Sequence, residues 1–585
     1  MNRRAIFSFI GIYFFAAGAA FVFGGNDEIN VTSVVDQPAS YILKGESSEQ
    51  VAEAVVAAGG EITHELGIIQ SVAANLTESQ VDELRVTRGI LRIYGNAAVE
   101  TAGKPNKDNG GGEDSNDSPT DLGGDVYTDY PTLVGADLLH EGGITGAGVT
   151  IAVLDTGLYG GPGLSQDAFS NDRILAAYDA VADQELIGRK TKLDSFDSDD
   201  NGHGSHVTSV AVSSKTATNG KYKGIAPGAH VVSVTAFDAQ GRGSYADVIR
   251  GIGWVLANQG KHNIKVLNLS LSATPQSHYW DDPLNQAVME AWANEIVVVA
   301  SAGNSGPSAQ SIGVPGNVPY VITVGAMTDN YTPADGSDDH LATFSATGPT
   351  YEGFVKPEIV APGGHIMANM QPDSHLAATY PQFHDGNTHF SMSGTSQSAA
   401  IVSGIVALIM QAEPHLMPDQ VKCKLMAAAR PATNPDGTLA YSVFQQGAGL
   451  VNAYDAVYGS TYDCANRGLD VFADLWGDQH FGGRANQDAN GDYYLMGLEG
   501  YLWTGGGVGT EGYLWTDGYL WTDGYLWTDG YLWTDGVGTD GYLWTDGYLW
   551  TDGYLWTDGY LWTDGYLWTD SLTETMSINT WVDPE

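Results

Sequence analysis

The apolar positions along the chain predict a large α/β unit in its middle. Five continuous apolar runs have the length of strands and lie at residues 149–154, 231–237, 264–269, 296–300 and 320–324. Helical periodicity covers residues 245–257, 283–293 and 397–411. Strands that are apolar on both sides and alternate with helices are typical of a parallel sheet with helices on both faces. We expect this unit to span residues 126–460.

A smaller unit with alternating strands and helices is expected before it, within residues 37–100. The apolar pattern predicts strands at residues 41–43, within 67–74 and at 90–94. Ser47 with Gln50, and Thr77 with Gln80, have the spacing of a capping box, which predicts a helix over residues 51–58 and a second after Thr77. The resulting β-α-β-β-α-β order is that of a ferredoxin-like α+β fold.

Two stretches at the start of the chain differ from both units. Residues 101–124 are rich in Gly, Asn, Asp, Ser and Pro and contain almost no apolar residue, which predicts an exposed flexible linker. Within residues 1–25, Arg3 and Arg4 precede an apolar run that ends at Phe23, and small residues occupy positions 17–19. This pattern predicts a signal peptide and a secreted protein, although the length of the run leaves an uncleaved membrane anchor as an alternative.

Composition narrows the classes of partner. The 585 residues include 70 acidic and 25 basic ones, for a formal net charge of −45. Nucleic-acid binding requires basic residues that neutralise phosphates, so this charge argues against it. Cys423 and Cys464 are the two cysteines of the chain. In an exported protein they either form one disulfide or remain two thiols, and the sequence leaves both open.

The C-terminal part is a repeat. Between residues 500 and 570 the tetrapeptide Tyr-Leu-Trp-Thr occurs ten times, mostly followed by Asp-Gly. A β-prone run before Asp-Gly is a hairpin signal, which would place Trp opposite Leu on neighbouring strands. A solenoid, self-association, adhesion to a surface or polymer, and a disordered tail remain open. A connecting segment, residues 461–499, precedes the repeat, and residues 571–585 follow it.

Chemically useful side chains follow the predicted strands. Asp155 ends the first run, His203 lies between two glycines where a helix begins, and Asn304 follows the run at 296–300. Ser396 opens a long apolar helix, where free backbone N–H groups favour negative charge. A serine, an imidazole and a carboxylate suffice for acyl transfer, and an amide can stabilise the oxyanion. The spacing alone does not show that these four groups meet.

Four segments resemble the subtilisin-like serine proteases, or subtilases. They are Val153-Leu154-Asp155-Thr156-Gly157, Gly202-His203-Gly204-Ser205-His206-Val207, Ala302-Gly303-Asn304 and Ser393-Gly394-Thr395-Ser396, in the order of that family. The resemblance implies a secreted endopeptidase in which Asp155 orients His203, His203 is the general acid/base, Ser396 attacks and Asn304 donates into the oxyanion hole. Gln397-Ser398-Ala399-Ala400 departs from the family's Met-Ala-(Ala/Thr)-Pro but removes no catalytic group. His203 and Asn304 disfavour the related sedolisins.

The resemblance also implies a substrate site and a role for the first unit. The substrate-binding residues it implies are Gly243, Ser270, Leu271, Ser272, Ala302, Gly303 and Gly313. A glycine at 313, on the floor of the specificity pocket, leaves room, so we expect a large apolar or aromatic residue before the scissile bond. Residues 37–100 resemble the subtilisin propeptide, an inhibitory folding aid, and self-cleavage is expected between about Asn96 and Gly124.

Metal binding and a second function are weaker expectations. The chemistry needs no cofactor, but subtilases often bind calcium, and Asp194, Asp197, Asp199 and Asp200 precede His203. A solvated acidic surface is the favoured interpretation of this loop, and His206 is expected to be structural. Residues 488–499 faintly resemble a calcium loop, although Tyr493 stands where that loop needs glycine. The alternative function is a surface adhesive or envelope protein whose protease domain serves its own maturation.

Overall fold

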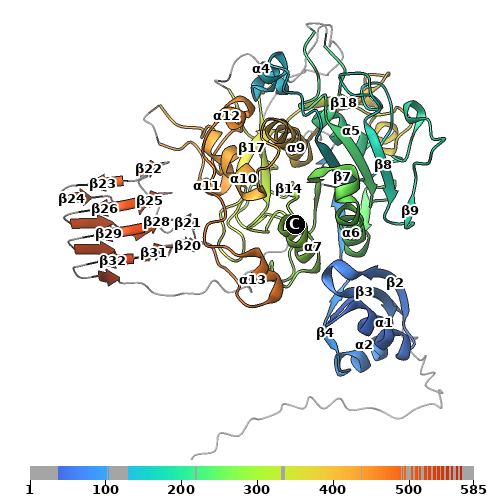
Figure 1. Cartoon of the computed structure of the whole chain (residues 1–585), viewed down its shortest axis with the longest axis horizontal. Coiled ribbons are helices and arrows are strands. Elements are labelled where there is room, and N and C mark those ends of the chain that lie inside the picture. The colour runs from blue at the N-terminus through green and yellow to red at the C-terminus, as the bar shows by residue number, and fades with distance from the viewer. Residues whose placement is uncertain are drawn as a thin grey trace, which may run out of the picture.

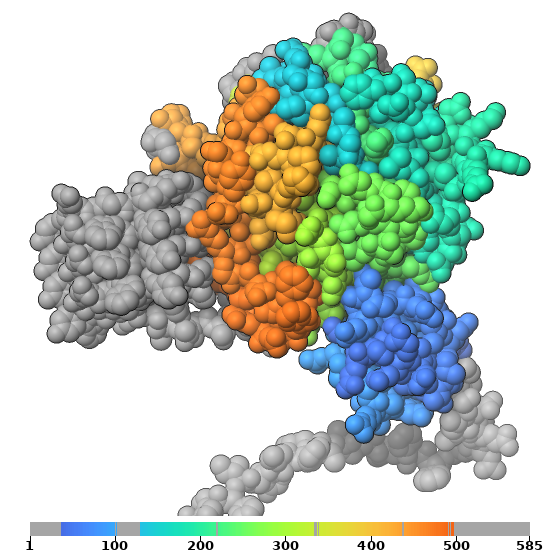
Figure 2. All heavy atoms as spheres, viewed as in Figure 1, coloured from blue at the N-terminus to red at the C-terminus, as the bar shows by residue number. Residues whose placement is uncertain are grey.

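The computed structural model describes residues 37–101, 103–104 and 129–495, except 218–219, 331, 333–335, 337, 436–437, 489–490 and 492. Beyond residue 501 it describes the backbone of the repeat strands. The predicted signal peptide and most of the predicted linker lie outside these residues. Figures 1 and 2 show the N-terminal unit, in blue, as a separate lobe beside the larger sheet domain.

The N-terminal unit has the predicted order of elements. Its elements are β1 (Ala39–Gly45), α1 (Ser48–Ala57), β2 (Glu61–Leu66), a 3-10 turn η1 (Gly67–Ile69), β3 (Ser71–Leu76), α2 (Glu78–Arg85) and β4 (Ile90–Gly95). The strands form one antiparallel sheet in the order β2-β3-β1-β4, which is the ferredoxin-like arrangement. Ser47 and Thr77 cap the two helices by accepting from the backbone N–H groups of Gln50 and Gln80.

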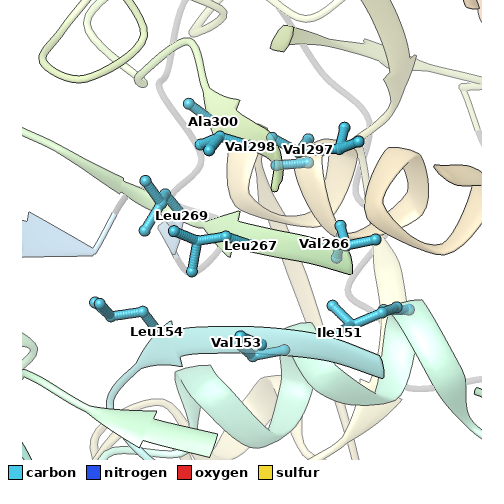
Figure 3. Close-up of a cluster of buried hydrophobic side chains, with 14 of the residues drawn as sticks. Ile151, Val153, Leu154, Val266, Leu267, Leu269, Val297, Val298 and Ala300 are labelled. Carbon is cyan, nitrogen blue, oxygen red and sulfur yellow. The ribbon is translucent and has the colours of Figure 1, made fainter. Parts of the chain in front are cut away.

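The larger domain is built on a mostly parallel sheet in the order β16-β15-β14-β12-β7-β10-β8-β9, with β17 also paired to β15. Its strands are β7 (Thr150–Asp155), β8 (Ile174–Asp179), β9 (Gln184–Glu185), β10 (His230–Thr235), β12 (Ile264–Leu269), β14 (Val297–Ser301), β15 (Ile322–Thr328), β16 (His340–Leu341) and β17 (Ile359–Pro362). The edge strands β9 and β16 are antiparallel to their neighbours. Figure 3 shows the apolar side chains that β7, β12 and β14 bury at its centre, which explains why these strands read as continuous apolar runs.

Helices cover both faces of the sheet, as predicted. α5 (His203–Val212) and α9 (Thr395–Ala412) pack together on one face, and α6 (Tyr245–His262) and α7 (Pro283–Ala293) cover the other (Figure 1). α10 (Pro418–Ala428) and α12 (Ala453–Tyr458) complete the α9 side. Shorter helices are α3 (Tyr130–Leu133), α4 (Ala136–Glu141), α8 (His375–Thr379), α11 (Val443–Gln446) and α13 (Val471–Trp476), and 3-10 turns are η2 (Leu193–Ser195) and η3 (Pro381–Phe383). Among the described residues, α9 alone is long and apolar enough to cross a membrane, but it is a core helix, with 89% of it buried.

Three short strands outside the main sheet hold the end of the N-terminal unit. β5 (Ala98–Thr101) lies between β11 (Arg242–Ser244) and β13 (Leu271–Ser272), antiparallel to both. β6 (Gly103–Lys104) pairs with β19 (His389–Gly394), which also pairs with β18 (Ile366–Asn369). The prediction that a flexible linker begins at residue 101 is therefore wrong for Thr101, Gly103 and Lys104. They lie in strands because the larger domain supplies their pairing partners.

The N-terminal unit also contacts the larger domain through side chains. His64 Nε2 lies 3.0 Å from Asp247 Oδ1, and Arg250 Nη2 donates to the carbonyl of Thr63 at 2.8 Å. Lys44 Nζ donates to Gln286 Oε1 at 2.7 Å. These contacts join the sheet of the small unit to α6 and α7.

The connecting segment docks on the larger domain. A disulfide joins Cys423 in α10 to Cys464, so the structure contains the bridge that the sequence left open. The buried carboxylate of Asp474 in α13 accepts hydrogen bonds from the hydroxyls of Tyr279 and Tyr320, each at 2.6 Å. β20 (Ala485–Gln487) and β21 (Tyr493–Leu495) then form a two-stranded antiparallel sheet.

The repeat region forms a solenoid in which each strand pairs in parallel with the third strand after it. The strands are β22 (Leu502–Thr504), β23 (Val508–Thr510), β24 (Tyr513–Trp515), β25 (Tyr519–Thr522), β26 (Tyr525–Thr528), β27 (Tyr531–Thr534), β28 (Gly536–Thr539), β29 (Tyr542–Thr545), β30 (Tyr548–Thr551), β31 (Leu555–Thr557), β32 (Leu561–Thr563) and β33 (Leu567–Thr569). They make three parallel four-stranded sheets (Figure 1). The hairpin expectation is wrong, because the chain moves to the next sheet after each hexad instead of reversing within one. Trp503 accordingly lies opposite Trp521, not opposite leucine.

Candidate active site

Asp155 and His203 meet at the carboxyl edge of the parallel sheet. Asp155 is the last residue of β7 and His203 is the first residue of α5. His203 Nδ1 lies 2.7 Å from Asp155 Oδ1, and the two side chains are 0% and 1% exposed. The N–H of Thr156 donates to the same carboxylate oxygen at 2.7 Å. Because a carboxylate oxygen can only accept, Nδ1 carries the proton and Nε2 is the basic nitrogen of the ring.

Two glycines allow the ends of β7 and α5 to approach each other. A β-carbon on Gly204 would lie 2.3 Å from the carbonyl oxygen of Gly157, and one on Gly157 would lie 2.1 Å from that of Ser198. Gly157 also has a φ of +132°, which side chains disfavour. The glycines beside Asp155 and His203 are therefore required by backbone contact, which explains the Asp-Thr-Gly and His-Gly motifs physically.

Asp199, which the sequence analysis grouped with three other acidic residues of its loop, supports this arrangement. Its buried carboxylate accepts from the hydroxyl of Thr156 at 2.7 Å and from the N–H of Gly202 at 2.8 Å. It also accepts from the N–H and hydroxyl of Ser205, at 2.7 and 2.6 Å. The interpretation of this loop as solvated surface is wrong for Asp199, which braces the residues on both sides of His203. The sequence of this loop, with its four acidic residues, did not indicate that one of them would be buried.

Ser396 is the second residue of α9 and is fully buried. Its hydroxyl donates to the carbonyl of Ser270 at 3.3 Å, and its own carbonyl accepts from Ser270 Oγ at 3.0 Å. The next residue, Gln397, lies 3.4 Å from His206, one turn beyond His203 in α5. The first turns of α5 and α9 are thus neighbours. Within the described part of the chain, His203 Nε2 has no hydrogen-bond partner.

His206 has the structural environment expected for it. Its Nε2 donates to the carbonyls of Ile366 and Phe390, at 3.1 and 3.0 Å. Complete burial, together with the smaller effect of the nearby His203, lowers the pKa of His206 to about 3. His206 is therefore neutral at physiological pH and ties α5 to β18 and β19.

Asn304 is oriented by the residue before Ser396. Its Oδ1 accepts from both the N–H and the hydroxyl of Thr395, each at 3.0 Å. The hydroxyl of Thr395 also accepts from the N–H of Gly303 at 3.2 Å. These bonds turn the amide oxygen toward Thr395, so Nδ2 is the end that can donate to a group at Ser396.

The segment that ends the N-terminal unit passes along these residues. Gly243 lies opposite Val99, and Leu271 lies opposite Thr101. After Ala102, which lies outside the described residues, Gly103 lies opposite Gly394, two positions before Ser396. The segment is therefore held on one side of Ser396 by β11 and β13 and on the other side by β19. It therefore pairs with Gly243, Leu271 and Ser272, which the family resemblance implies are substrate-binding residues, as an added strand would.

The structure brings the remaining predicted substrate residues together beside Ser396. The N–H of Gly313 donates to the carbonyl of Ala302 at 3.1 Å, and residue 273, next to Ser272, pairs with residue 314. The space beside Gly313 is not open, because a β-carbon there would lie 2.0 Å from Ser272 Oγ. The premise that glycine at 313 leaves room is therefore wrong. The side chain of Ser272 fills that space. A glycine in the sequence does not indicate which side chain of a neighbouring strand packs against it.

Among the described residues, no group of three or more His, Cys, Asp or Glu side chains is placed to hold a metal ion. Asp197 accepts from the side-chain amide of Gln371 at 3.0 Å. Burial raises the pKa of Asp197, and the nearby Asp199 raises it further. Most of the faint calcium-loop pattern at 488–499 lies outside the described residues.

Comparison with known proteins decides the family. The profile of the subtilase family matches residues 146–449, which contain all four motif segments. The chain belongs to the subtilase family. Serine protease AprX from Bacillus subtilis (strain 168) is 39% identical over 54% of this chain and 67% of its own length. Subtilisin DY from Bacillus licheniformis is 31% identical over 55% of this chain and 94% of its own length.

A solved structure agrees with this assignment at the level of the fold. Fervidolysin from Fervidobacterium pennivorans, described as a keratinolytic enzyme related to subtilisin, superposes with a TM-score of 0.55 at 24% identity. The alignment covers 73% of this chain and 62% of fervidolysin. The subtilase fold and a serine protease activity on protein substrates are thus established for this chain by its family.

Proposed function

We propose that this subtilase is a secreted endopeptidase that uses Asp155, His203 and Ser396 and releases itself from its N-terminal unit. The pairing of His203 Nδ1 with Asp155, at 2.7 Å, carries the first part of the proposal. It leaves Nε2 to accept a proton, and the Ser396 hydroxyl, which donates to Ser270 here, must turn to Nε2 before attack.

The reaction follows from these positions. Ser396 Oγ attacks the carbonyl carbon before the scissile bond while His203 Nε2 takes its proton. Asn304 Nδ2 and the N–H of Ser396 donate to the oxyanion that forms. His203 then protonates the leaving amine as the C–N bond breaks, and an ester to Ser396 remains. Water, deprotonated by His203, attacks this ester, the bond to Ser396 Oγ breaks, His203 returns the proton to Oγ, and the carboxylic acid leaves.

The bond cleaved during maturation is the one between Ala102 and Gly103. The pairings of Thr101 with Leu271 and of Gly103 with Gly394 support this, because Ser270 contacts Ser396 and Gly394 precedes it by two residues. Residue 102 connects these two pairings in the chain, so the bond that follows it is the one we propose for cleavage. While the segment stays in place, β5 and β6 take the strand positions that any other substrate would need. The N-terminal unit therefore inhibits the enzyme until it leaves.

Mass spectrometry of the purified protein tests this proposal. The wild-type chain should yield a mature form that begins at Gly103, and a serine-directed phosphonate should label Ser396. Ser396→Ala should remain a full-length precursor in a protease-free host. Efficient processing of Ser396→Ala, or a first mature N-terminus far from residue 103, would contradict the proposal. Ser195→Ala, at an exposed position away from Ser396, is the matched control and should be processed normally.

Two features support export. The apolar run after Arg3 and Arg4 has the pattern of a signal peptide, and the bridge between Cys423 and Cys464 suits an oxidising compartment. We therefore place the mature enzyme outside the cell. Its excess of acidic residues argues against a nucleic-acid partner.

The repeat suggests attachment of the enzyme to a surface or polymer. In-register pairing places Trp515, Trp533, Trp550 and Trp568 at equivalent positions of successive coils, so aromatic residues repeat at the strand spacing of about 4.8 Å. Deletion of residues 500–585 should leave cleavage of casein unchanged and reduce retention on cells. Unchanged retention would contradict this role. Retention without proteolysis by the mature wild-type protein would favour the alternative of an adhesive protein, which the family assignment does not favour.

A further inference from the structure

The hydroxyl of Ser272 occupies the space that a side chain at Gly303 or at Gly313 would need. A β-carbon on Gly313 would lie 2.0 Å from Ser272 Oγ, and one on Gly303 would lie 2.9 Å from the same atom. Rotation of the hydroxyl would still leave Ser272 Cβ 3.3 Å and the carbonyl oxygen of Ala273 3.0 Å from the first point, which is closer than ordinary contact, and Ser272 Cβ 3.6 Å from the second, which is ordinary contact. Three separate segments of the chain therefore converge on one small volume that a serine side chain already fills.

Backbone hydrogen bonds hold these three segments together. Ala273 and Val314 exchange two bonds, at 3.0 and 2.8 Å, which fix the strand of Ser272 beside Gly313. The bond from the Gly313 N–H to Ala302 fixes the loop before Asn304 against the same wall. Ala302, Ile312 and Ala346 pack together as a small apolar cluster in these segments. The walls have little freedom to move apart when a larger group enters.

This volume borders the strand that pairs with the segment before the proposed scissile bond. Leu271 and Ser272 lie opposite Thr101 and Glu100, so the strand of Ser272 borders the bound segment as far as Thr101. Ser270, which contacts Ser396 directly, precedes them in the same run. The next residue of the bound segment is Ala102, whose side chain is a single methyl group.

We propose that Ser272 is a specificity-determining residue that restricts the residue before the scissile bond to small side chains such as alanine. The proposal rests on the proposed function, since it concerns the same site. A larger side chain would have to displace Ser272 from a close-packed wall, and overpacking of this kind is unfavourable. The sequence independently has alanine, whose side chain is one methyl group, at position 102. The substrate class is therefore proteins cut after small residues, in place of the aromatic preference that Gly313 alone suggested.

Peptide substrates with the sequence of the bound segment test this directly. Mature enzyme is assayed with succinyl-Val-Glu-Thr-X-p-nitroanilide, where X is Ala, Leu or Phe. The wild-type kcat/KM should be at least tenfold higher for Ala than for Phe. Ser272→Gly should raise kcat/KM for Phe at least tenfold and change that for Ala less than threefold. The kcat/KM of Ser272→Ala for Phe should lie between those of the wild type and Ser272→Gly. Ser195→Gly, a change in an exposed loop, should match the wild type.

A second experiment uses the chain as its own substrate. Ala102→Phe should slow conversion of the precursor at least tenfold, and adding Ser272→Gly to the same chain should restore most of the rate. Wild-type preference for Phe, or an unchanged Phe-to-Ala ratio in Ser272→Gly, would overturn the pocket assignment while leaving the peptidase intact. Absence of Ser396-dependent hydrolysis of every peptide would instead overturn the proposed function. Phosphonate labelling of Ser396 in each variant shows that the variant has folded.

Discussion

His203 Nδ1 lies 2.7 Å from Asp155 Oδ1, although the two residues are 48 positions apart in the chain. The carboxylate is almost fully buried and accepts from the backbone N–H of Thr156 as well. Its position therefore fixes both the orientation of the imidazole and the nitrogen that bears the proton.

Asp155→Asn should lower kcat by about 10⁴, because an amide at this position no longer favours the tautomer with a basic Nε2. The measurement is the steady-state hydrolysis of succinyl-Val-Glu-Thr-Ala-p-nitroanilide by mature enzyme. Because self-cleavage should fail as well, the variant is released by cleavage at an engineered site after residue 104. Asp194→Asn, in the exposed loop, is the control and should keep full activity. A loss below tenfold for Asp155→Asn would argue against its proposed role.

Asn304→Leu should lower kcat by about 10²–10³ with little change in KM, because it removes one donor to the oxyanion. That magnitude is taken over from the corresponding donor in subtilisin. Thr395 orients the amide through two hydrogen bonds at 3.0 Å, so Thr395→Val should cause a smaller loss of kcat. An equal rise in KM and no change in kcat for Asn304→Leu would indicate ground-state binding instead.

Val99→Asp should slow self-cleavage at least tenfold. Val99 is fully buried opposite Gly243, and a carboxylate there would lose its hydration without gaining a partner of opposite charge. The time course of precursor conversion, followed by gel electrophoresis, gives the rate. Ala98→Asp changes the exposed neighbour in the same strand and should convert at nearly the wild-type rate. Equal rates for the two variants would show that β5 is not held in this way during cleavage.

His206 should make the folded protein sensitive to acid. Its folded pKa of about 3 lies below the ordinary value of 6.5, so between these pH values the unfolded chain binds a proton that the folded chain does not. Stability due to neutral His206 is therefore present above pH 6.5 and lost as the pH falls toward 3. In urea unfolding of the Ser396→Ala precursor, the stability advantage of His206 over His206→Gln should shrink by about 3 kcal/mol between pH 7 and pH 4. His375→Gln, at an exposed position, should show no such change.

Replacing both Cys423 and Cys464 by serine should lower the free energy of unfolding by about 2–4 kcal/mol, because the bridge closes a long loop in the unfolded chain. The two residues are separated by 41 positions. Chemical denaturation of the Ser396→Ala precursor measures the loss, and the same double change in active enzyme should leave kcat/KM unchanged. Full stability of the double variant would mean that α13 and Asp474 hold the connecting segment without the bridge.

Local patterns predicted much of the fold. The strand at Ile264–Leu269 and the helix at Pro283–Ala293 have the bounds that periodicity predicted. A buried strand or an amphipathic helix has a regular pattern of apolar residues along consecutive positions, and the sequence shows that pattern directly. The capping residues Ser47 and Thr77 were predictable because each bonds to a residue only three positions further along the chain. β8 (Ile174–Asp179) was missed, since Ala176 and Ala177 weaken its apolar signal.

The sequence by itself determined the order of the parts, the motif residues Asp155, His203, Asn304 and Ser396, and the chemistry that such groups can perform. Only the tertiary structure decided that Asp199 braces the site, that Thr101 and Gly103 lie in strands, and that Ser272 fills the space beside Gly313. Each of these depends on groups brought together from distant positions, such as a carboxylate against backbone N–H groups or a hydroxyl against a facing glycine. Hydrophobic periodicity records whether a residue is buried, and it carries no information on which distant atom the residue meets.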